Sequence, residues 1–244
     1  MLVLAGLGIS DEKGITLEEI EEAKSADYLF IELYTSIWHG NLQNLERIVG
    51  RKIEILRRRD LEEESDRILR LAVNRKVMIF VPGDPLVATT HSSLIIECKK
   101  RRIDFKILHN SSILSAVCET GLHAYKFGPS VTIPLKERTK NKLESIVELI
   151  KQNKERGLHT LCFLDVDIEA NKFLKVCDAI KFLVESKIIE EEEKIVVASC
   201  IGTDKQKFIW KEAKSLTDLQ VDLPAVIIIP GNLHFSEREM LGTF

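Results

Sequence analysis

The stretch VMIFVPGDPLVATTH, residues 77–91, joins an apolar run to a turn that contains glycine and proline. The run is apolar throughout rather than alternating, which is typical of a strand covered by helices on both faces. Gly83 and Pro85 in the turn are residue types that reverse the chain and let its backbone approach a ligand closely. This combination predicts an α/β protein whose ligand lies at the carboxyl ends of its strands.

Strand-length apolar runs recur along the chain, separated by segments with helical period. Thr16 followed by Glu19 fits a helix-capping box, and Asp60 with Glu63 makes a similar pair. Gly50 stands where a glycine commonly ends a helix. The alternation predicts largely parallel sheets. Strands are expected at residues 2–5, 28–33, 77–81, 105–108, 131–134, 160–164, 194–199 and 225–229.

The alternation also divides the chain. A first series of strand–helix steps extends to about residue 110, and a second series starts near residue 130. We therefore expect two α/β domains, residues 1–110 and 111–244, with a ligand-binding cleft between them.

Composition excludes several classes of protein. The 244 residues carry a formal net charge of -3, whereas proteins that bind nucleic acids usually show a basic excess. No apolar run approaches the roughly 18 residues of a membrane-spanning helix. The N-terminal apolar stretch is short and lacks the basic flank of a secretory signal. We expect a cytoplasmic protein that binds neither membranes nor nucleic acids.

The cysteines show no metal-binding pattern. They form no CxxC pair, and no histidine stands at zinc-finger spacing from them. We expect reduced, mostly buried thiols and no metal site. The five positions are Cys98, Cys118, Cys162, Cys177 and Cys200.

The turns after the strands lack the known phosphate-binding motifs. Gly6 and Gly8 follow the first strand, but Asp11 stands where the dinucleotide fingerprint needs its next glycine. No GxxxxGK[ST] loop occurs either. Both absences argue against a cofactor that contains pyrophosphate.

Two polar residues in these turns are candidates for ligand contacts. Asp84, fixed between Gly83 and Pro85, suits a ligand with an ammonium group or free hydroxyls, or alternatively only stabilises its turn. His234, in a PGNLH turn, either caps local structure or contacts a ligand. His91 and His109 are no more decisive. No catalytic triad, HExxH motif or paired-carboxylate signature appears, so the catalytic residues are unknown.

Four stretches resemble one known family. They are LAGLGISDEKGITLEEIEEAKSADYLFIELYTS from Leu4, GDPLVATTH from Gly83, HNSSILSAVCETGLHAYKFGPSVTIP from His109 and PGNLHFSEREML from Pro230. On these stretches the chain resembles the diphthine synthases, S-adenosylmethionine-dependent methyltransferases with the tetrapyrrole-methylase fold.

The resemblance implies a homodimer of two-domain α/β subunits. It implies methylation of the amino group on a modified histidine of translation elongation factor 2. The cofactor S-adenosylmethionine has an ammonium group, a ribose diol and no phosphate, which agrees with the residues of the turns. The cofactor-binding residues implied by matching motifs are Ile9, Asp84, Val87, Ser112, Ile113, Leu164, Ile209 and His234.

Two other functions are open to this sequence. A tetrapyrrole C-methyltransferase would share fold and cofactor, but such enzymes usually continue the GDP motif with a phenylalanine–glycine–arginine type run, where this chain has residues 86–91, LVATTH. A non-catalytic S-adenosylmethionine-binding protein would use the same turns.

As methyl transfer to an amine needs a neutral nitrogen, we expect desolvation to lower the amine's pKa, with no single essential base.

Overall fold

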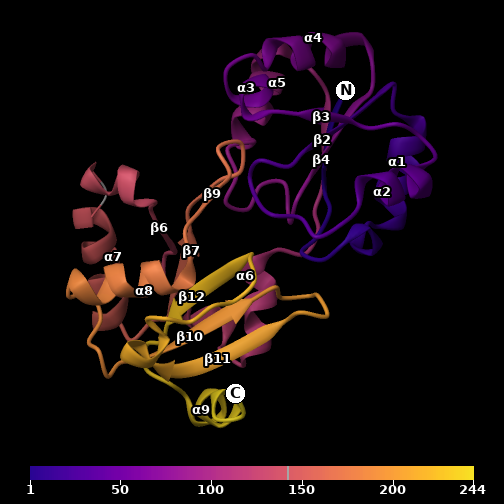
Figure 1. Cartoon of the computed structure of the whole chain (residues 1–244). Coiled ribbons are helices and arrows are strands. Elements are labelled where there is room, and N and C mark those ends of the chain that lie inside the picture. Colours follow the sequence, from indigo (N-terminus) through magenta and orange to yellow (C-terminus); the bar gives the residue numbers. More distant parts are fainter. Residues whose placement is uncertain (142) are drawn as a thin grey trace. The chain divides into compact units, whose positions relative to one another are not determined.

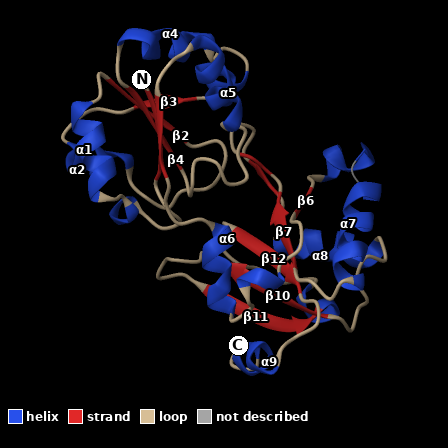
Figure 2. Cartoon of the chain, turned by 180° about the vertical axis from the view of Figure 1, so that it is seen from behind, coloured by secondary structure: helices blue, strands red, loops and turns tan. Residues whose placement is uncertain are grey.

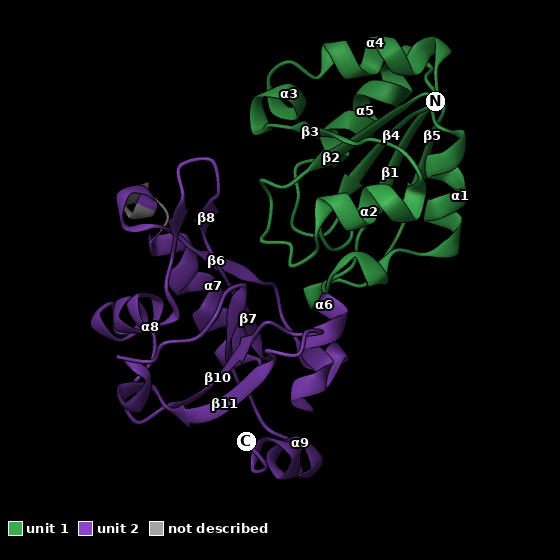
Figure 3. Ribbon diagram, turned by 45° about the vertical axis from the view of Figure 1, so that its right-hand side comes forward, with its two compact units in different colours: residues 1–113 green, residues 114–244 purple. Residues whose placement is uncertain are grey.

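The computed structural model describes residues 1–141 and 143–244. The chain divides into two compact units, Met1–Ile113 and Leu114–Phe244, drawn in two colours in Figure 3. The sequence places this division after residue 110, and in the structure it falls after Ile113. Each unit is built around its own five-stranded sheet.

The first unit has a sheet with the strand order β3-β2-β4-β1-β5, in which every pairing is parallel. Its strands are β1 (Leu2–Gly6), β2 (Tyr28–Glu32), β3 (Glu54–Leu56), β4 (Val77–Val81) and β5 (Phe105–Leu108). Its helices are α1 (Leu17–Ser25), α2 (Leu42–Val49), α3 (Arg58–Glu62), α4 (Asp66–Asn74) and α5 (Ser92–Arg101), with a short 3-10 turn at Glu12–Gly14.

Helices cover both faces of this first sheet. Helices α3, α4 and α5 lie on one side, and α1 and α2 lie on the other (Figure 1). Successive strand residues point to opposite faces, so Leu4 packs with the first group and Val3 packs with the second. All five residues of β1 and all five of β4 are buried. The expectation from their uninterrupted apolar runs is confirmed.

The second unit has the strand order β11-β10-β12-β7-β6. Its strands are β6 (Val131–Ile133), β7 (Thr160–Leu164), β10 (Lys194–Ser199), β11 (Lys207–Glu212) and β12 (Ala225–Ile229), with a separate small hairpin of β8 (Val166–Asp167) and β9 (Lys172–Phe173). Its helices are α6 (Ile113–Ala116), which begins at the last residue of the first unit, α7 (Leu143–Glu155), α8 (Val176–Glu185) and α9 (Phe235–Leu241). Short 3-10 segments lie at Val117–Thr120, Ala124–Lys126, Lys136–Asn141 and Ala213–Leu216.

The prediction of a largely parallel sheet is wrong for this unit. Strands β6 and β7 are parallel, but β7, β12, β10 and β11 pair in antiparallel fashion. A short loop joins β10 to β11, and such a loop can connect only antiparallel neighbours. Helices α7 and α8 pack on one face of the sheet, and α6 lies on the opposite side (Figure 2).

Two strands of the large sheets were not expected from the sequence, and both lie at sheet edges. Strand β3 falls within the basic stretch RKIEILRRR and has two exposed residues. Strand β11, KFIWKE, has no buried residue, and charged side chains lie on both sides of its three apolar ones. Edge strands of this kind carry the charges that block pairing with other chains, and therefore lack a continuous apolar run.

Two of the three predicted helix ends are confirmed. The Thr16 amide donates to Glu19 Oε2 at 2.6 Å, and the Glu19 amide donates back to Thr16 Oγ1 at 3.2 Å. Gly50 ends α2 with a φ of 73°. The interpretation of Asp60 is wrong, because its carboxylate accepts from the Arg57 amide at 2.8 Å, at the start of α3. Helix α4 begins separately.

Across the described residues, no helix is long and apolar enough to cross a membrane. The five cysteines are free thiols, and four of them are buried. Within the same described part, no group of three or more His, Cys, Asp and Glu side chains could hold a metal ion.

Candidate functional site

The turns that follow β1 and β4 are fastened to each other by their backbones. The Gly8 amide donates to the Gly83 carbonyl at 3.1 Å, and the Gly83 amide donates to the Gly8 carbonyl at 2.8 Å. Both glycines have a φ near 70°, at 71° and 70°, where an L side chain is disfavoured. This pair fixes two of the ligand-binding turns that the sequence predicts.

Asn110, in the turn after β5, connects the third turn to these two. Its carboxamide donates to the Gly6 carbonyl at 2.8 Å and to the Gly14 carbonyl at 3.0 Å. Its own amide donates to Asp84 Oδ2 at 3.3 Å. Because β4, β1 and β5 are neighbours in a parallel sheet, their carboxyl ends meet at one edge, and Asn110 joins them there.

Asp84 lies at the centre of the three turns and is only 6% exposed. Its Oδ1 accepts from the Leu86 amide at 3.0 Å. Its Oδ2 lies 2.7 Å from His109 Nδ1 and also accepts from the Asn110 amide. A carboxylate can accept about four hydrogen bonds, so roughly one position is left for a ligand. Asp84 therefore does stabilise its turn, and a ligand contact is open to it as well.

The other predicted residues of the first unit lie in the same three turns. Ile9 and Val87 are half-buried in the turns after β1 and β4. Ser112 is buried and Ile113 half-buried after β5. Next to Val87, Ala88 has a φ of 56°, which is costly for a residue with a Cβ and is more frequent at functional sites.

A buried cluster supports the outer side of the turn after β4. His91 is 1% exposed, and its Nδ1 lies 3.2 Å from the Pro85 carbonyl. Because a carbonyl only accepts, Nδ1 carries the hydrogen, and Nε2 faces the Tyr34 hydroxyl at 3.5 Å. Burial raises the pKa of Glu32, 3.9 Å from that nitrogen, to about 7. Burial also lowers the pKa of His91, which favours the neutral ring.

The predicted residues of the second unit are spread over its sheet. Leu164, the last residue of β7, and Ile209 of β11 both pack against the core under α7 and α8. His234 follows β12, whose last residue, Ile229, pairs with Thr160 at the start of β7. Leu164 and His234 therefore lie at opposite ends of β7. The structure brings the five first-unit residues together and leaves these three apart.

His234 caps helix α9. Its Nδ1 lies 2.8 Å from Ser236 Oγ, and its amide donates to Glu237 Oε2 at 2.7 Å. The side chain is exposed, and its ring centre lies 5.4 Å from that of His123. Of the two roles that the sequence leaves open, the structure shows the cap, and the ring remains accessible.

Glu237 is a fully buried carboxylate that sequence reasoning missed. It accepts from the amides of His123 at 2.8 Å and His234 at 2.7 Å, from His159 Nε2 at 3.0 Å, and from the Lys126 ammonium. Burial alone would raise the pKa of Glu237, but these donors, led by Lys126, outweigh it and lower the pKa to about 2. The signal in the sequence was a Glu three residues after the turn residue His234, a capping-box spacing.

The chain is similar to known proteins over its whole length. Residues 1–217 match the family model of the Tetrapyrrole (Corrin/Porphyrin) Methylases. The diphthine synthase of Methanocaldococcus jannaschii is 39% identical, with 99% of this chain and 97% of the relative covered. That of Methanococcus aeolicus is 36% identical, with 99% and 96% covered. The crystal structure of a diphthine synthase superposes with a TM-score of 0.90 at 32% identity, covering 100% of this chain and 95% of the other.

Fold, strand-end turns and family model together define a methyltransferase of the tetrapyrrole-methylase fold. Within that fold the chain belongs to the diphthine synthases, the methyltransferases of diphthamide biosynthesis. The resemblance of its four sequence stretches is thereby confirmed. A tetrapyrrole C-methyltransferase and a non-catalytic binding protein are not favoured, because the curated relatives are diphthine synthases.

Proposed function

We propose that the chain binds S-adenosylmethionine at the three fastened turns of the first unit and transfers its methyl group to a modified histidine of elongation factor 2. The observation that carries the proposal is the convergence of the turns after β4, β1 and β5 around Asp84, in a chain of this family. When bound, the cofactor supplies a methyl group that is already activated on sulfur.

The residues at these turns fit that cofactor. A Cβ added to Gly83 would meet nothing within 4 Å, so open space adjoins the backbone beside Asp84. The open acceptor position of Asp84 suits an ammonium or hydroxyl group. The apolar side chains of Ile9, Val87 and Ile113 suit an adenine ring or a methylene chain. Within the described residues, these three turns hold no phosphate-binding loop.

The cofactor-binding residues remain part of the proposal. The five residues of the first unit, Ile9, Asp84, Val87, Ser112 and Ile113, are supported by their shared edge of the sheet. Leu164 and Ile209 rest on the resemblance alone. For His234, support comes from its exposed ring.

The family supports the protein substrate of this proposal. Diphthine is a modified histidine, and the relatives are named diphthine synthases. Elongation factor 2 works in translation, so the same proposal includes a cytoplasmic location. It also includes a homodimer, which the resemblance implies.

Purified protein is expected to transfer a radiolabelled methyl group from S-adenosylmethionine to elongation factor 2 that carries the partly modified histidine. Elongation factor 2 with an unmodified histidine is the matched control and should stay unlabelled. Uroporphyrinogen and precorrins should also stay unlabelled. Labelling of a tetrapyrrole, with none of the elongation factor, would contradict the proposal.

Gly83→Ala is expected to weaken S-adenosylmethionine binding at least tenfold, because the new methyl group fills the open space beside Asp84. The free energy of unfolding should fall by only about 1–2 kcal/mol, the cost of a left-handed conformation for a residue with a Cβ. Calorimetric titration and urea denaturation measure the two effects. Unchanged affinity in the folded variant would place the cofactor elsewhere.

A further inference from the structure

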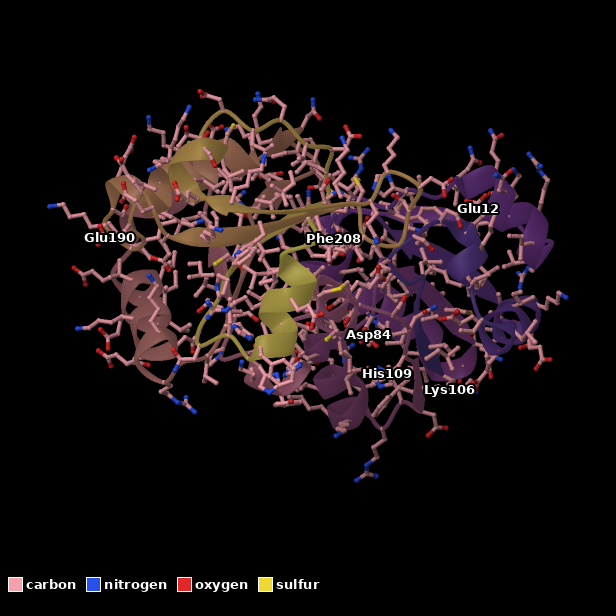
Figure 4. The ribbon with its side chains drawn as sticks, turned by 90° about the horizontal axis from the view of Figure 1, so that it is seen from below. Glu12, Asp84, Lys106, His109, Glu190 and Phe208 are labelled. Atoms are coloured by element: carbon pink, nitrogen blue, oxygen red, sulfur yellow. The ribbon has the colours of Figure 1, made fainter. Side chains whose placement is uncertain are left out.

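We propose that His109 is the general base of the methyl transfer and that Asp84 orients it; this inference rests on the proposed function. His109 Nδ1 lies 2.7 Å from Asp84 Oδ2. The Asp84 side chain is 7% exposed, whereas that of His109 is 67% exposed. Figure 4 shows the two residues side by side. A buried carboxylate thus holds one edge of an imidazole whose other edge faces outward.

The contact determines which nitrogen can act as a base. An ionised carboxylate only accepts hydrogen bonds, so the hydrogen of the neutral ring lies on Nδ1. Nε2 then keeps its lone pair and faces away from Asp84. The carboxylate itself is fixed by the amides of Leu86 and Asn110, so the ring has a defined orientation. Its negative charge also stabilises the imidazolium that forms when Nε2 takes a proton.

Among the described residues, the buried histidines His91 and His159 are not available in this way. His91 has one ring nitrogen against the Pro85 carbonyl and the other facing the Tyr34 hydroxyl. His159 accepts from the Gly231 amide through Nδ1 and donates to Glu237 through Nε2. At His109, by contrast, a carboxylate contacts Nδ1 and most of the side chain is exposed. His109 also lies in one of the turns that we propose to bind the cofactor.

The surroundings of the ring favour this role. Asp84, from the turn after β4, is the charged group that contacts the imidazole. Lys106, on β5 itself, is held by Glu18 at 2.6 Å and Glu22 at 2.9 Å, both on α1. Among the described residues, no hydrogen bond or ion pair joins a cation to His109.

The chemistry needs such a group because an aliphatic ammonium has a pKa near 10 and no lone pair. His109 Nε2 takes a proton from the acceptor's ammonium. The freed lone pair forms the bond from nitrogen to the methyl carbon, while the carbon–sulfur bond breaks and leaves its electron pair on sulfur. The imidazolium then releases its proton to water. From the sequence we expect desolvation alone to lower the pKa of the amine. Here desolvation assists His109, because it lowers the barrier to the same proton transfer.

The experiment compares single-turnover transfer at saturating cofactor as a function of pH in the wild type, His109→Gln and His39→Gln. His39 is an exposed histidine of the same unit and is the matched control. At neutral pH, His109→Gln should lower the rate by roughly 10²–10⁴-fold, the usual effect of losing a general base. Its rate should rise with pH as solvent deprotonates the amine. Calorimetry should show cofactor affinity within about twofold of the wild type, and His39→Gln should match the wild type throughout.

Asp84→Asn provides a readout that does not depend on turnover. Oδ1 still accepts from the Leu86 amide, so the new NH2 group takes the place of Oδ2 and gives up the longer bond from the Asn110 amide. It faces His109 Nδ1 as a donor and reverses the tautomer. Nitrogen NMR of ¹⁵N-histidine protein should show the hydrogen on Nδ1 in the wild type and on Nε2 in the variant.

Three results would overturn the inference: an unchanged neutral-pH rate in His109→Gln, a deficit cured by more cofactor, or a wild-type hydrogen on Nε2. A wild type that labels no elongation factor would instead refute the proposed function.

Discussion

Glu237→Ala is expected to lower the free energy of unfolding of the second unit by about 3–5 kcal/mol. The substitution removes the carboxylate that accepts from the amides of His123 and His234, from His159 Nε2 and from the Lys126 ammonium. Three donors lose their acceptor beside a fully buried position, and the Lys126 ammonium keeps only the Asn232 carbonyl. Buried donors without partners are costly. The cost is larger for Lys126, because its charge then has no counter-ion.

Urea denaturation measures this effect. Trp210 on β11 is the tryptophan of the second unit, so its fluorescence in a Trp38→Phe background follows that unit. Glu239→Ala is the matched control, because Glu239 is an exposed carboxylate of the same helix, and it should change the free energy by less than about 0.5 kcal/mol. A similarly small change for Glu237→Ala would show that the buried network contributes little.

The pH dependence of unfolding tests the same residue. The pKa of Glu237 is lowered from its ordinary value of 4.5 to about 2. The ionised form is thus favoured in the folded state, and its stabilisation is present above about pH 4.5 and lost as the pH falls towards 2. Burial lowers the pKa of His159 from its ordinary value of 6.5. The folded state therefore disfavours the protonated ring, and the free energy of unfolding also falls for this reason as the pH drops below 6.5. The part of the acid destabilisation due to Glu237 should be missing in Glu237→Ala.

Gly6→Ala is expected to reduce S-adenosylmethionine affinity at least 100-fold and to lower the free energy of unfolding of the first unit by about 3 kcal/mol. An added Cβ would lie 2.4 Å from the Gly83 carbonyl oxygen and 2.8 Å from Asn110 Cβ. Neither neighbour can move alone, because Gly83 is paired with Gly8 and Asn110 donates to the Gly6 carbonyl. The turn after β1 must therefore separate from both of its partners.

Gly50→Ala is the control for a general effect of losing a glycine. Gly50 has a φ of 73°, and a Cβ there would meet nothing within 4 Å. Its replacement should cost about 1–2 kcal/mol and leave cofactor affinity unchanged. Calorimetry and denaturation of both variants separate the two kinds of cost. Wild-type affinity in Gly6→Ala would show that the fastened turns do not form the cofactor site.

Much of the fold could be predicted from local patterns. The fully apolar runs of β1 and β4, the Thr16 capping box and the helix end at Gly50 are encoded by neighbouring residues, and the structure has them. The strand-end turns could also be predicted, because each follows its strand in the sequence. Edge strands β3 and β11 could not, since their charged side chains face water and interrupt the apolar signal.

The sequence by itself determined the apolar strands, the turns that follow them and the family, because these depend on residues close together in the chain. Tertiary structure alone decided which turns meet. The contact of Asp84 with His109 spans 25 positions, and that of Glu237 with His159 spans 78. Such pairs follow from strand order and register, which place β4 near β5 and the end of β12 beside the start of β7. The role of an isolated acidic residue or histidine cannot be predicted from the sequence, because its partner is distant in the chain and only the sheet brings the two together.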